Sequence, residues 1–183
     1  MFTTEVKVKA LPVLEWLDRY CFPGKFLDAC KACPDYGRVW SCPPGVPEAE
    51  ALLGRCRTAY LIGVKVCYRP ADLARALRSQ EEAEAVRQET YGVAKKALLE
   101  ALLALEERCP GSITVAAGRC EQCAGCTRTQ GLPCRKPERM RYSFSAFGFD
   151  LTALAREQLD LDLLWAGRGL PPYNAALAAF LTR

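Results

Sequence analysis

The feature that most constrains this chain is a run of three cysteines, Cys120, Cys123 and Cys126, which is followed by Cys134. The run is otherwise polar and contains Gly125, so we expect a loop that wraps its thiolates around one centre. Iron–sulfur proteins of the bacterial ferredoxin type use the same C-x-x-C-x-x-C spacing, with a fourth cysteine from further along the chain. Short loops of this kind let adjacent thiolates reach separate corners of a cubane. The spacing therefore predicts a [4Fe–4S] cluster held by these four cysteines.

Two other interpretations of the run stay open. Structural zinc sites more often use two separated C-x-x-C pairs than one continuous run, so zinc is the alternative metal. Unliganded cysteines behave as apolar core residues. Because this stretch is polar, a set of unliganded buried thiols is the least favoured interpretation.

A second cysteine group, Cys30, Cys33 and Cys42, precedes the run, and proline directly follows two of its members. A proline in that place lacks an N–H and has a fixed φ, which turns the chain away from a bound centre. We expect this group to hold a second metal centre close to the first. Its fourth ligand stays open between Cys21, Cys134 by cross-ligation, and a group that is not cysteine. A loop merely stiffened by its prolines is the alternative.

Composition limits the chemistry further. The 183 residues contain eleven cysteines and no histidine. Without histidine, Cys2His2 zinc, Rieske ligation, histidine-ligated haem and Ser-His or Cys-His catalytic pairs are excluded. The net charge of +4 is mild, and we expect no nucleic-acid partner. The sequence also contains no phosphate loop, dinucleotide fingerprint or nucleophile elbow.

The start of the chain and its apolar runs bear on the compartment. Residues 1–9 alternate apolar and charged side chains and include Glu5, which is unlike a signal peptide. No apolar run reaches the roughly 18 residues of a membrane helix, because Lys65 and Glu100 interrupt the best candidates. Many cysteines without a secretory signal indicate metal binding rather than disulfides. We therefore expect a cytoplasmic protein with no membrane partner.

The hydrophobic pattern predicts a single domain over residues 1–183, of the α/β (α+β) class. It should contain a small mixed sheet, flanking helices and two cysteine-rich metal-binding loops, at 30–44 and 118–136. Strands are expected at residues 2–8, 60–67 and 112–117, with Phe2, Val6 and Val8 on one face. Helices are expected after Pro12 with Leu14 and Leu17 inward, at 47–56, 138–146 and 151–158, and over 70–105 as one helix or as two broken near 79–82. Residues 173–182 stay ambiguous between helix and strand, after a loop with Trp165, Gly167 and Gly169.

The strand–helix–strand order of residues 60–117 predicts two parallel neighbouring strands. The cysteine run would then leave the carboxyl end of a strand, where open α/β sheets place their sites. Cys56 and Cys67 are predicted to be core thiols. Several basic side chains follow the run. They could offset the charge of a cluster, raise the reduction potential of the cluster, or dock an acidic redox partner. The alternative is that they are plain solvated residues. They are Arg128, Arg135, Lys136, Arg139 and Arg141.

Two separate motifs resemble a known family. They are Cys30-x-x-Cys33-Pro34-x-Tyr36-Gly37-x-x-Trp40-Ser41-Cys42-Pro43-Pro44, and Cys120-x-x-Cys123-x-x-Cys126 followed by residues 133–138 and 147–150. In this order they resemble a prokaryotic family of predicted metal-binding proteins of unknown function, from about Phe26 to Asp160. The resemblance implies metal binding by the seven motif cysteines. Phe149 stands where the family has a small aliphatic residue, a departure that affects packing rather than ligands.

Three classes of function follow from these observations. The preferred one is an iron–sulfur redox module with one or two [4Fe–4S] clusters, which passes electrons to a partner protein. The second is an enzyme that works at an open-site cluster, with Tyr36 and Trp40 lining a small pocket. The third is a zinc-stabilised interaction protein without redox chemistry. Whether the protein is an enzyme stays open at this point.

Overall fold

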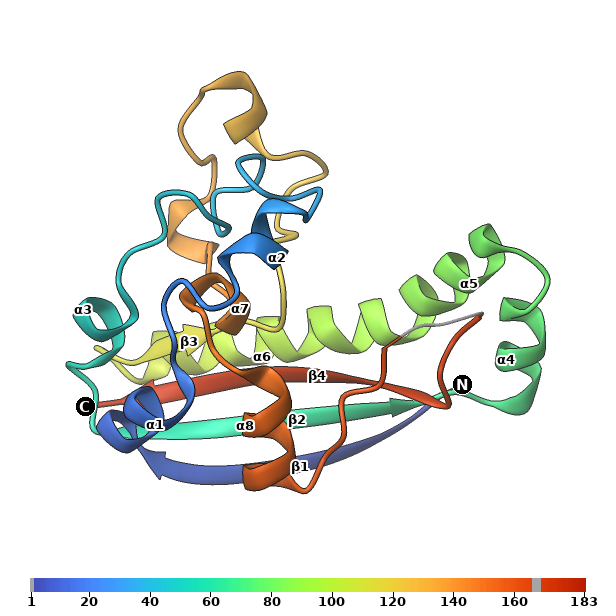
Figure 1. Ribbon diagram of the computed structural model, residues 1–183, viewed down its shortest axis with the longest axis horizontal. Coiled ribbons are helices and arrows are strands. Elements are labelled where there is room, and N and C mark those ends of the chain that lie inside the picture. The colour runs from blue at the N-terminus through green and yellow to red at the C-terminus, as the bar shows by residue number, and fades with distance from the viewer. Residues whose placement is uncertain (1, 166–168) are drawn as a thin grey trace.

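The computed structural model describes residues 2–165 and 169–183, and its centre is a four-stranded sheet of order β1-β2-β4-β3 (Figure 1). Every pairing in this sheet is antiparallel. The strands are β1 (Thr3–Pro12), β2 (Thr58–Cys67), β3 (Ile113–Val115) and β4 (Tyr173–Thr182). A small sheet with flanking helices confirms the expected α+β class, but the sheet is antiparallel rather than mixed.

The expectation that β2 and β3 are neighbours is wrong. Both strands pair antiparallel with β4, so they point the same way, but β4 lies between them. The ambiguous segment 173–182 is thus a central strand. Its alanines Ala176, Ala178 and Ala179 are at most 1% exposed. Their small side chains let the layers on both faces pack close to the sheet.

Eight α-helices and three short turns of other helix types occur among the described residues. The α-helices are α1 (Val13–Tyr20), α2 (Leu27–Lys31), α3 (Ala49–Leu53), α4 (Pro70–Ala76), α5 (Gln80–Arg87), α6 (Val93–Arg108), α7 (Phe144–Phe147) and α8 (Leu151–Leu159). The turns are the π-helical η1 (Gln88–Gly92) and the 3-10 helices η2 (Thr127–Gln130) and η3 (Pro137–Arg139). The helix predicted at 138–146 is wrong, because Pro137 opens only a single 3-10 turn before α7.

The long helical segment has a break at Ser79, as the two-helix alternative required. The Ser79 hydroxyl caps α5 by accepting a hydrogen bond from Glu82 N at 3.2 Å. Asp150 caps α8 in the same way and accepts from Ala153 N at 3.0 Å, which confirms the predicted start of that helix. Local capping residues therefore fix both helix starts.

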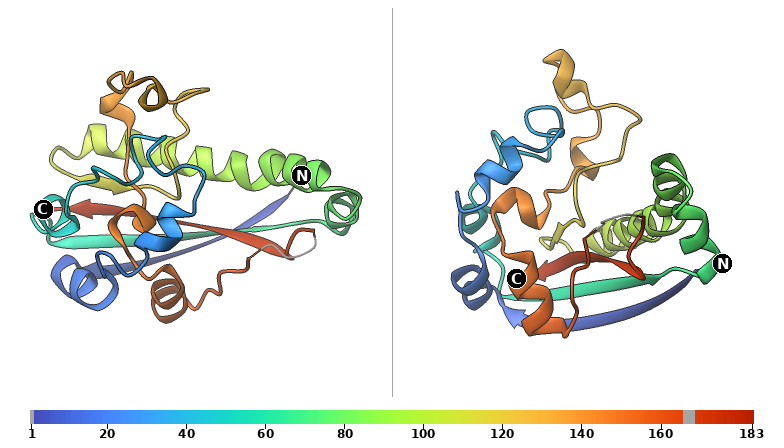
Figure 2. Two further views of the ribbon diagram at one scale, coloured as in Figure 1. Left: turned by 45° about the horizontal axis from the view of Figure 1, so that its top comes forward. Right: turned by 45° about the vertical axis from the view of Figure 1, so that its right-hand side comes forward.

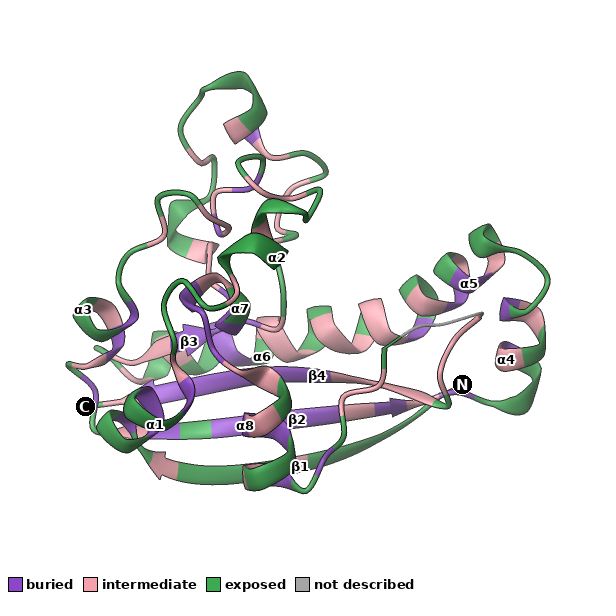
Figure 3. Ribbon diagram, viewed as in Figure 1, coloured by how far each residue is buried: buried purple, intermediate pink, exposed green. Residues whose placement is uncertain are grey.

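The two faces of the sheet carry different layers (Figures 2 and 3). Helix α6 covers one face, where Leu102 packs with Ala178 and Phe180. The other face holds the larger core, in which Trp16 of α1 packs against Phe144 at 5.4 Å between ring centroids. These layers leave the β3 edge of the sheet free for the cysteine-rich segments.

Close packing of α8 on the sheet depends on one glycine. A Cβ atom at Gly63 of β2 would lie 2.7 Å from Leu159 Cδ1 and 3.0 Å from Leu161 Cδ2. Contacts that short are tighter than a Cβ atom normally makes, so a side chain at this position would force the ends of these two leucine side chains to shift.

Two predictions about burial need correction, those for Leu14 and Cys67. Leu14 is 65% exposed, because α1 starts at Val13 and turns that residue inward instead. Val6 and Val8 share a face as predicted, yet each is close to 60% exposed, since β1 is an edge strand. Cys56 is a core thiol, but Cys67 is only partly buried.

Gly167 lies outside the described residues. Trp165 and Gly169 lie in a segment without helix or strand, as expected. None of the described helices is long and apolar enough to cross a membrane.

Candidate metal centre

The cysteine run begins directly beyond the end of β3. Ala116 N donates to Tyr142 O at 2.8 Å, and the chain then turns at Gly118, whose φ is +79°. Only glycine adopts this left-handed conformation at little cost, so Gly118 redirects the chain from the sheet into the loop. Both cysteine-rich segments lie beside each other beyond the β3 edge (Figures 1 and 2).

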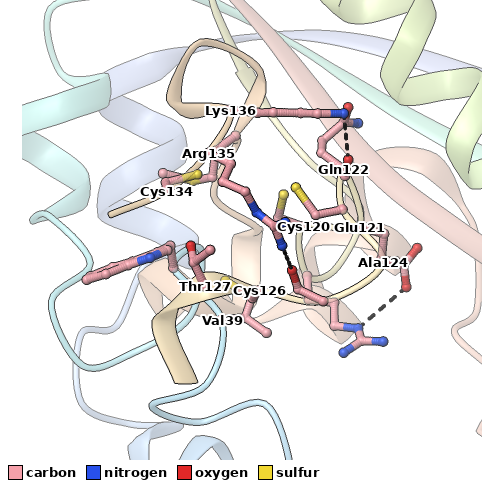
Figure 4. Close-up of a pocket in the computed structure, with 15 residues that line it drawn as sticks. Val39, Cys120, Glu121, Gln122, Ala124, Cys126, Thr127, Cys134, Arg135 and Lys136 are labelled. Atoms are coloured by element: carbon pink, nitrogen blue, oxygen red, sulfur yellow. Dashed lines mark hydrogen bonds and ion pairs between the residues drawn. The ribbon is translucent and has the colours of Figure 1, made fainter. Parts of the chain in front are cut away.

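All four cysteines of the first predicted centre line one cavity of about 90 Å³ (Figure 4). Cys120, Cys123 and Cys126 come from the run, and Cys134 reaches the same cavity from beyond η2. Each is partly buried. Trp40 also lines the cavity, so the other cysteine-rich segment contributes to its wall.

The protonation of Cys120 reflects this crowding. Burial raises the pKa of the Cys120 thiol, and the nearby thiols of Cys134, Cys123 and Cys126 raise it further, against a backbone hydrogen bond from Gln122. A bound cation reverses this preference, because it stabilises thiolates and releases their protons. Without such a cation, the raised pKa favours the neutral thiol at Cys120.

The two basic residues that directly follow Cys134 form hydrogen bonds with the loop. Arg135 Nη2 donates to Gly125 O at 2.6 Å, and Lys136 Nζ donates to Gln122 O at 3.0 Å (Figure 4). Both carbonyls belong to residues between the cysteines of the run. Hydrogen bonds from charged donors are stronger than neutral ones, so these two hold Cys134 against the other three cysteines.

Two further basic residues after the run form ion pairs. Arg139 and Arg141 form ion pairs with Glu100 and Glu106 of α6. Burial alone would raise the pKa of Glu106, but Arg141 and the Thr114 amide outweigh it and hold that pKa below its usual range. The interpretation of these arginines as plain solvated residues is wrong, because they fasten the cysteine segment to α6.

The second predicted group is also brought together. Burial raises the pKa of the Cys42 thiol; the Ser41 hydrogen bond opposes this, and Asp35, Cys33 and Cys30 raise it further. Cys33 N donates to Cys30 O at 3.0 Å, at the end of α2. The three thiols are therefore neighbours in space as well as in sequence.

The surroundings of this group bear on its fourth ligand. Cys21 donates its thiol proton to Phe147 O at 3.3 Å. Burial, and to a smaller extent the negative charge of Glu48, raises the pKa of the Cys21 thiol to about 11. Asp35 lies nearer to the group, with Oδ2 at 4.0 Å from Cys33 Sγ. This carboxylate is a neighbour that the sequence reasoning missed.

The two cysteine-rich segments bind each other directly. Cys120 N donates to the Ser41 hydroxyl at 2.9 Å, and Ser41 is fully buried. Arg119 pairs with Asp35 at 2.7 Å, and Trp40 Nε1 donates to Leu132 O at 3.2 Å. The predicted convergence of the two groups agrees with these contacts. A polar residue directly beside a ligand cysteine, such as Ser41 or Arg119, is the signal that points to them.

Arg128 makes the strongest link between the segments. Its guanidinium donates to Val39 O at 2.9 Å, Cys42 O at 2.7 Å and Pro44 O at 2.5 Å, and lies 5.0 Å from the centre of the Trp40 ring. One side chain thus satisfies three carbonyls around the last cysteine of the second group.

An Arg128→Met variant is expected to open the second loop locally. Losing three charge-assisted hydrogen bonds should lower the opening free energy at the Cys42 amide by about 2 kcal/mol, or roughly 30-fold in hydrogen exchange rate. Amide exchange followed by NMR measures this. Arg135→Met is the matched control, because Arg135 bonds a carbonyl of the other loop; equal acceleration at Cys42 in both variants would contradict the assignment.

The predicted small pocket beside Tyr36 and Trp40 is partly realised. Trp40 lines the cavity of the first centre. Tyr36 is not among the described residues that line it.

Fold and site together define a class: a cysteine-rich α+β protein that gathers two cysteine loops beside one edge of its sheet and is suited to metal binding. The chain belongs to the DUF2284 family, described as predicted metal-binding protein, whose model matches residues 17–173. This confirms the resemblance seen in the two motifs. Comparisons with curated proteins and with solved structures found no match.

Proposed function

We propose that the protein binds a [4Fe–4S] cluster through Cys120, Cys123, Cys126 and Cys134 and acts as an iron–sulfur redox module. The observation that carries the proposal is that all four thiols line one cavity. Their spacing is that of a cubane-binding loop. When bound, such a cluster supplies one-electron transfer. A partner protein would deliver or accept the electron.

The spacing of the cysteines in the sequence favours a cluster over a single zinc ion. Among residues 2–165 and 169–183, no three Cys, Asp or Glu side chains are gathered tightly enough to hold one ion. Four sulfurs on one zinc lie about 3.8 Å apart, given Zn–S bonds of about 2.3 Å. The ligands of a cubane occupy separate corners instead, and a continuous C-x-x-C-x-x-C run is the spacing that cubane-binding loops use.

The charges around the cavity also suit a cluster. A cubane with four thiolates is an anion, and the residues that line the cavity include three cations, Arg119, Arg135 and Lys136, against one carboxylate, Glu121. Positive charge beside a cluster stabilises its reduced form and raises its reduction potential. These residues therefore combine a structural role in the loop with an electrostatic one.

The proposal extends to a second centre at Cys30, Cys33 and Cys42. With two clusters side by side the protein would be an electron relay. A group with only three cysteines favours a second candidate function, an enzyme that works at an open iron. If Asp35 acted as the fourth ligand, that iron would have no open coordination site.

Metal analysis of protein purified without oxygen tests the proposal. We expect iron and acid-labile sulfide in equal amounts, about four of each per cluster, with the brown colour of thiolate-to-iron charge transfer. Zinc in place of iron, with a colourless protein, would contradict it and support the zinc-stabilised alternative. Purification in the presence of added zinc controls for adventitious exchange.

A further inference from the structure

A second and larger cavity, of about 370 Å³, lies at the open edge of β4. Strand β3 pairs only with Ala179, Phe180 and Leu181 of β4. In the described part of the chain, residues 173–178 therefore have no strand on that side. The cavity occupies this place, and its volume falls within the range of roughly 300–1,000 Å³ that is typical of small-molecule sites.

The walls of this cavity are largely apolar. Phe144, Leu151, Leu163 and Leu177 line it, from α7, α8, the segment after α8 and β4. Walls of this kind bind an apolar body, and the few polar groups among them decide which head group fits.

The polar side chains that line the cavity can donate hydrogen bonds. Arg87 uses Nε and Nη2 to bind Glu84, each at 2.8 Å, which leaves Nη1 of the guanidinium for another acceptor. Asn174 accepts from the Tyr68 hydroxyl through Oδ1, so its amide nitrogen is available as a donor. Tyr91 adds a phenol to the same wall.

These donors lie close to one another. Arg87 and Tyr91 are four residues apart on one helical segment and therefore on one face. Burial raises the pKa of Tyr68, and Arg87 and Tyr91 are both near enough to alter it as well. Arg87, Tyr91 and Asn174 line the same cavity and make up its donor group. Glu84, which pairs with Arg87, is near Tyr68 as well.

The backbone beside the donor group is unusual. Tyr91 lies in the π-helical turn η1, which interrupts the passage from α5 to α6. Such turns are rare and recur at functional sites. This observation is independent of the cavity and points to the same place.

The cavity also adjoins both cysteine groups. Gly118, two residues before Cys120, lines it. Ser145 lines it as well, and the Ser145 carbonyl accepts from Cys30 Sγ at 3.9 Å. A molecule bound here would lie next to the segments that carry both proposed metal centres.

We propose that this cavity is a binding site for a small organic carboxylate with an apolar body. Phe144, Leu151 and Leu177 would hold the body. Asn174 Nδ2, the Tyr91 hydroxyl and the free guanidinium nitrogen of Arg87 would bind the carboxylate. The site goes beyond metal binding and does not require a particular metal.

Benzoate is a suitable probe, with benzyl alcohol and benzylamine as its neutral and cationic counterparts. Calorimetry on the anaerobically purified protein should show that benzoate binds at least about tenfold more tightly than benzyl alcohol, because a charged acceptor makes stronger hydrogen bonds. Amide NMR shifts should concentrate at Gly118, Asn174 and Leu177. Equal binding of the two probes, or no binding of benzoate up to its solubility, would overturn the proposal.

An Asn174→Asp variant sharpens the test. Aspartate keeps the oxygen that accepts from Tyr68 but places a negative charge in the cavity. Benzoate binding should weaken at least about tenfold, whereas benzylamine binding should strengthen. Unchanged binding of both probes would show that they bind elsewhere.

A second pair of variants guards against misfolding. Arg87→Gln should also weaken benzoate binding. Its matched control is Arg75→Gln. Arg75 also forms ion pairs with helix glutamates, Glu82 and Glu89, but does not line the cavity. Equal weakening by both variants would assign the effect to helix stability and reject the site. Benzoate binding that persists in Cys123→Ser would show that this site stands even where the cluster proposal fails.

Discussion

A Cys123→Ser variant should lose the first cluster, with about four fewer iron atoms per chain and a matching loss of visible absorption. Cys123 lies between the other two cysteines of the run and lines the same cavity. The Cys123 thiol takes part in none of the hydrogen bonds and ion pairs described above for the loop. Serine has nearly the same size but is a far poorer ligand for iron, so the substitution removes one of the four ligands and changes the protein little otherwise.

The control for this variant is Cys67→Ser. Cys67 is also partly buried, but it ends β2 and lies 4.0 Å from Glu5 Oε1, outside both loops. Iron content and spectrum should equal those of the wild type. If Cys123→Ser also retained full iron and colour, the four cysteines would not hold the cluster.

A Cys42→Ser variant should remove the second centre and leave the first. Iron should fall from about eight to about four atoms per chain, and the spectrum of the first cluster should remain. The magnetic coupling expected between two neighbouring reduced clusters should disappear from the electron paramagnetic resonance spectrum. Wild type and variant with one cluster's iron and identical spectra would show that the second site does not exist.

Two companion variants address the fourth ligand of that centre. Cys21→Ser and Asp35→Asn each remove one candidate donor. A change in the second-centre spectrum with only one of them would identify the ligand. Asp35→Asn also breaks the ion pair with Arg119, so Arg119→Gln is its control, because it breaks the same pair and keeps the carboxylate.

Contact between the loops has a consequence for any relay function. The Cys120 amide bonds Ser41, and Arg128 bonds the Cys42 carbonyl. Each loop thus holds a residue next to a proposed ligand of the other centre. A change of charge or geometry at one centre would reach the other through these bonds, which gives a physical route for coupling their reduction potentials.

Local signals explain what the sequence predicts well. The β-branched run of β2 and the Asp150 cap of α8 are properties of a few adjacent residues. The three cysteines of the run span only seven positions, so a single loop brings them to one cavity without help from the rest of the chain. Pro137 is a weaker signal, because it begins a 3-10 turn that does not continue into an α-helix.

Contacts between distant residues explain what the sequence alone could not predict. The alanine-rich segment 173–182 is a central strand because the fold places β4 between β2 and β3. The cavity beside β4 exists because β3 is too short to pair with the whole of β4. Arg128 meets the Cys42 and Pro44 carbonyls across 86 and 84 positions. Motif spacing selects the proposed metal-binding cysteines because each motif is local in the sequence. Only the tertiary structure joins the two loops and pairs the arginines with α6, since these contacts depend on how remote segments pack on one sheet edge.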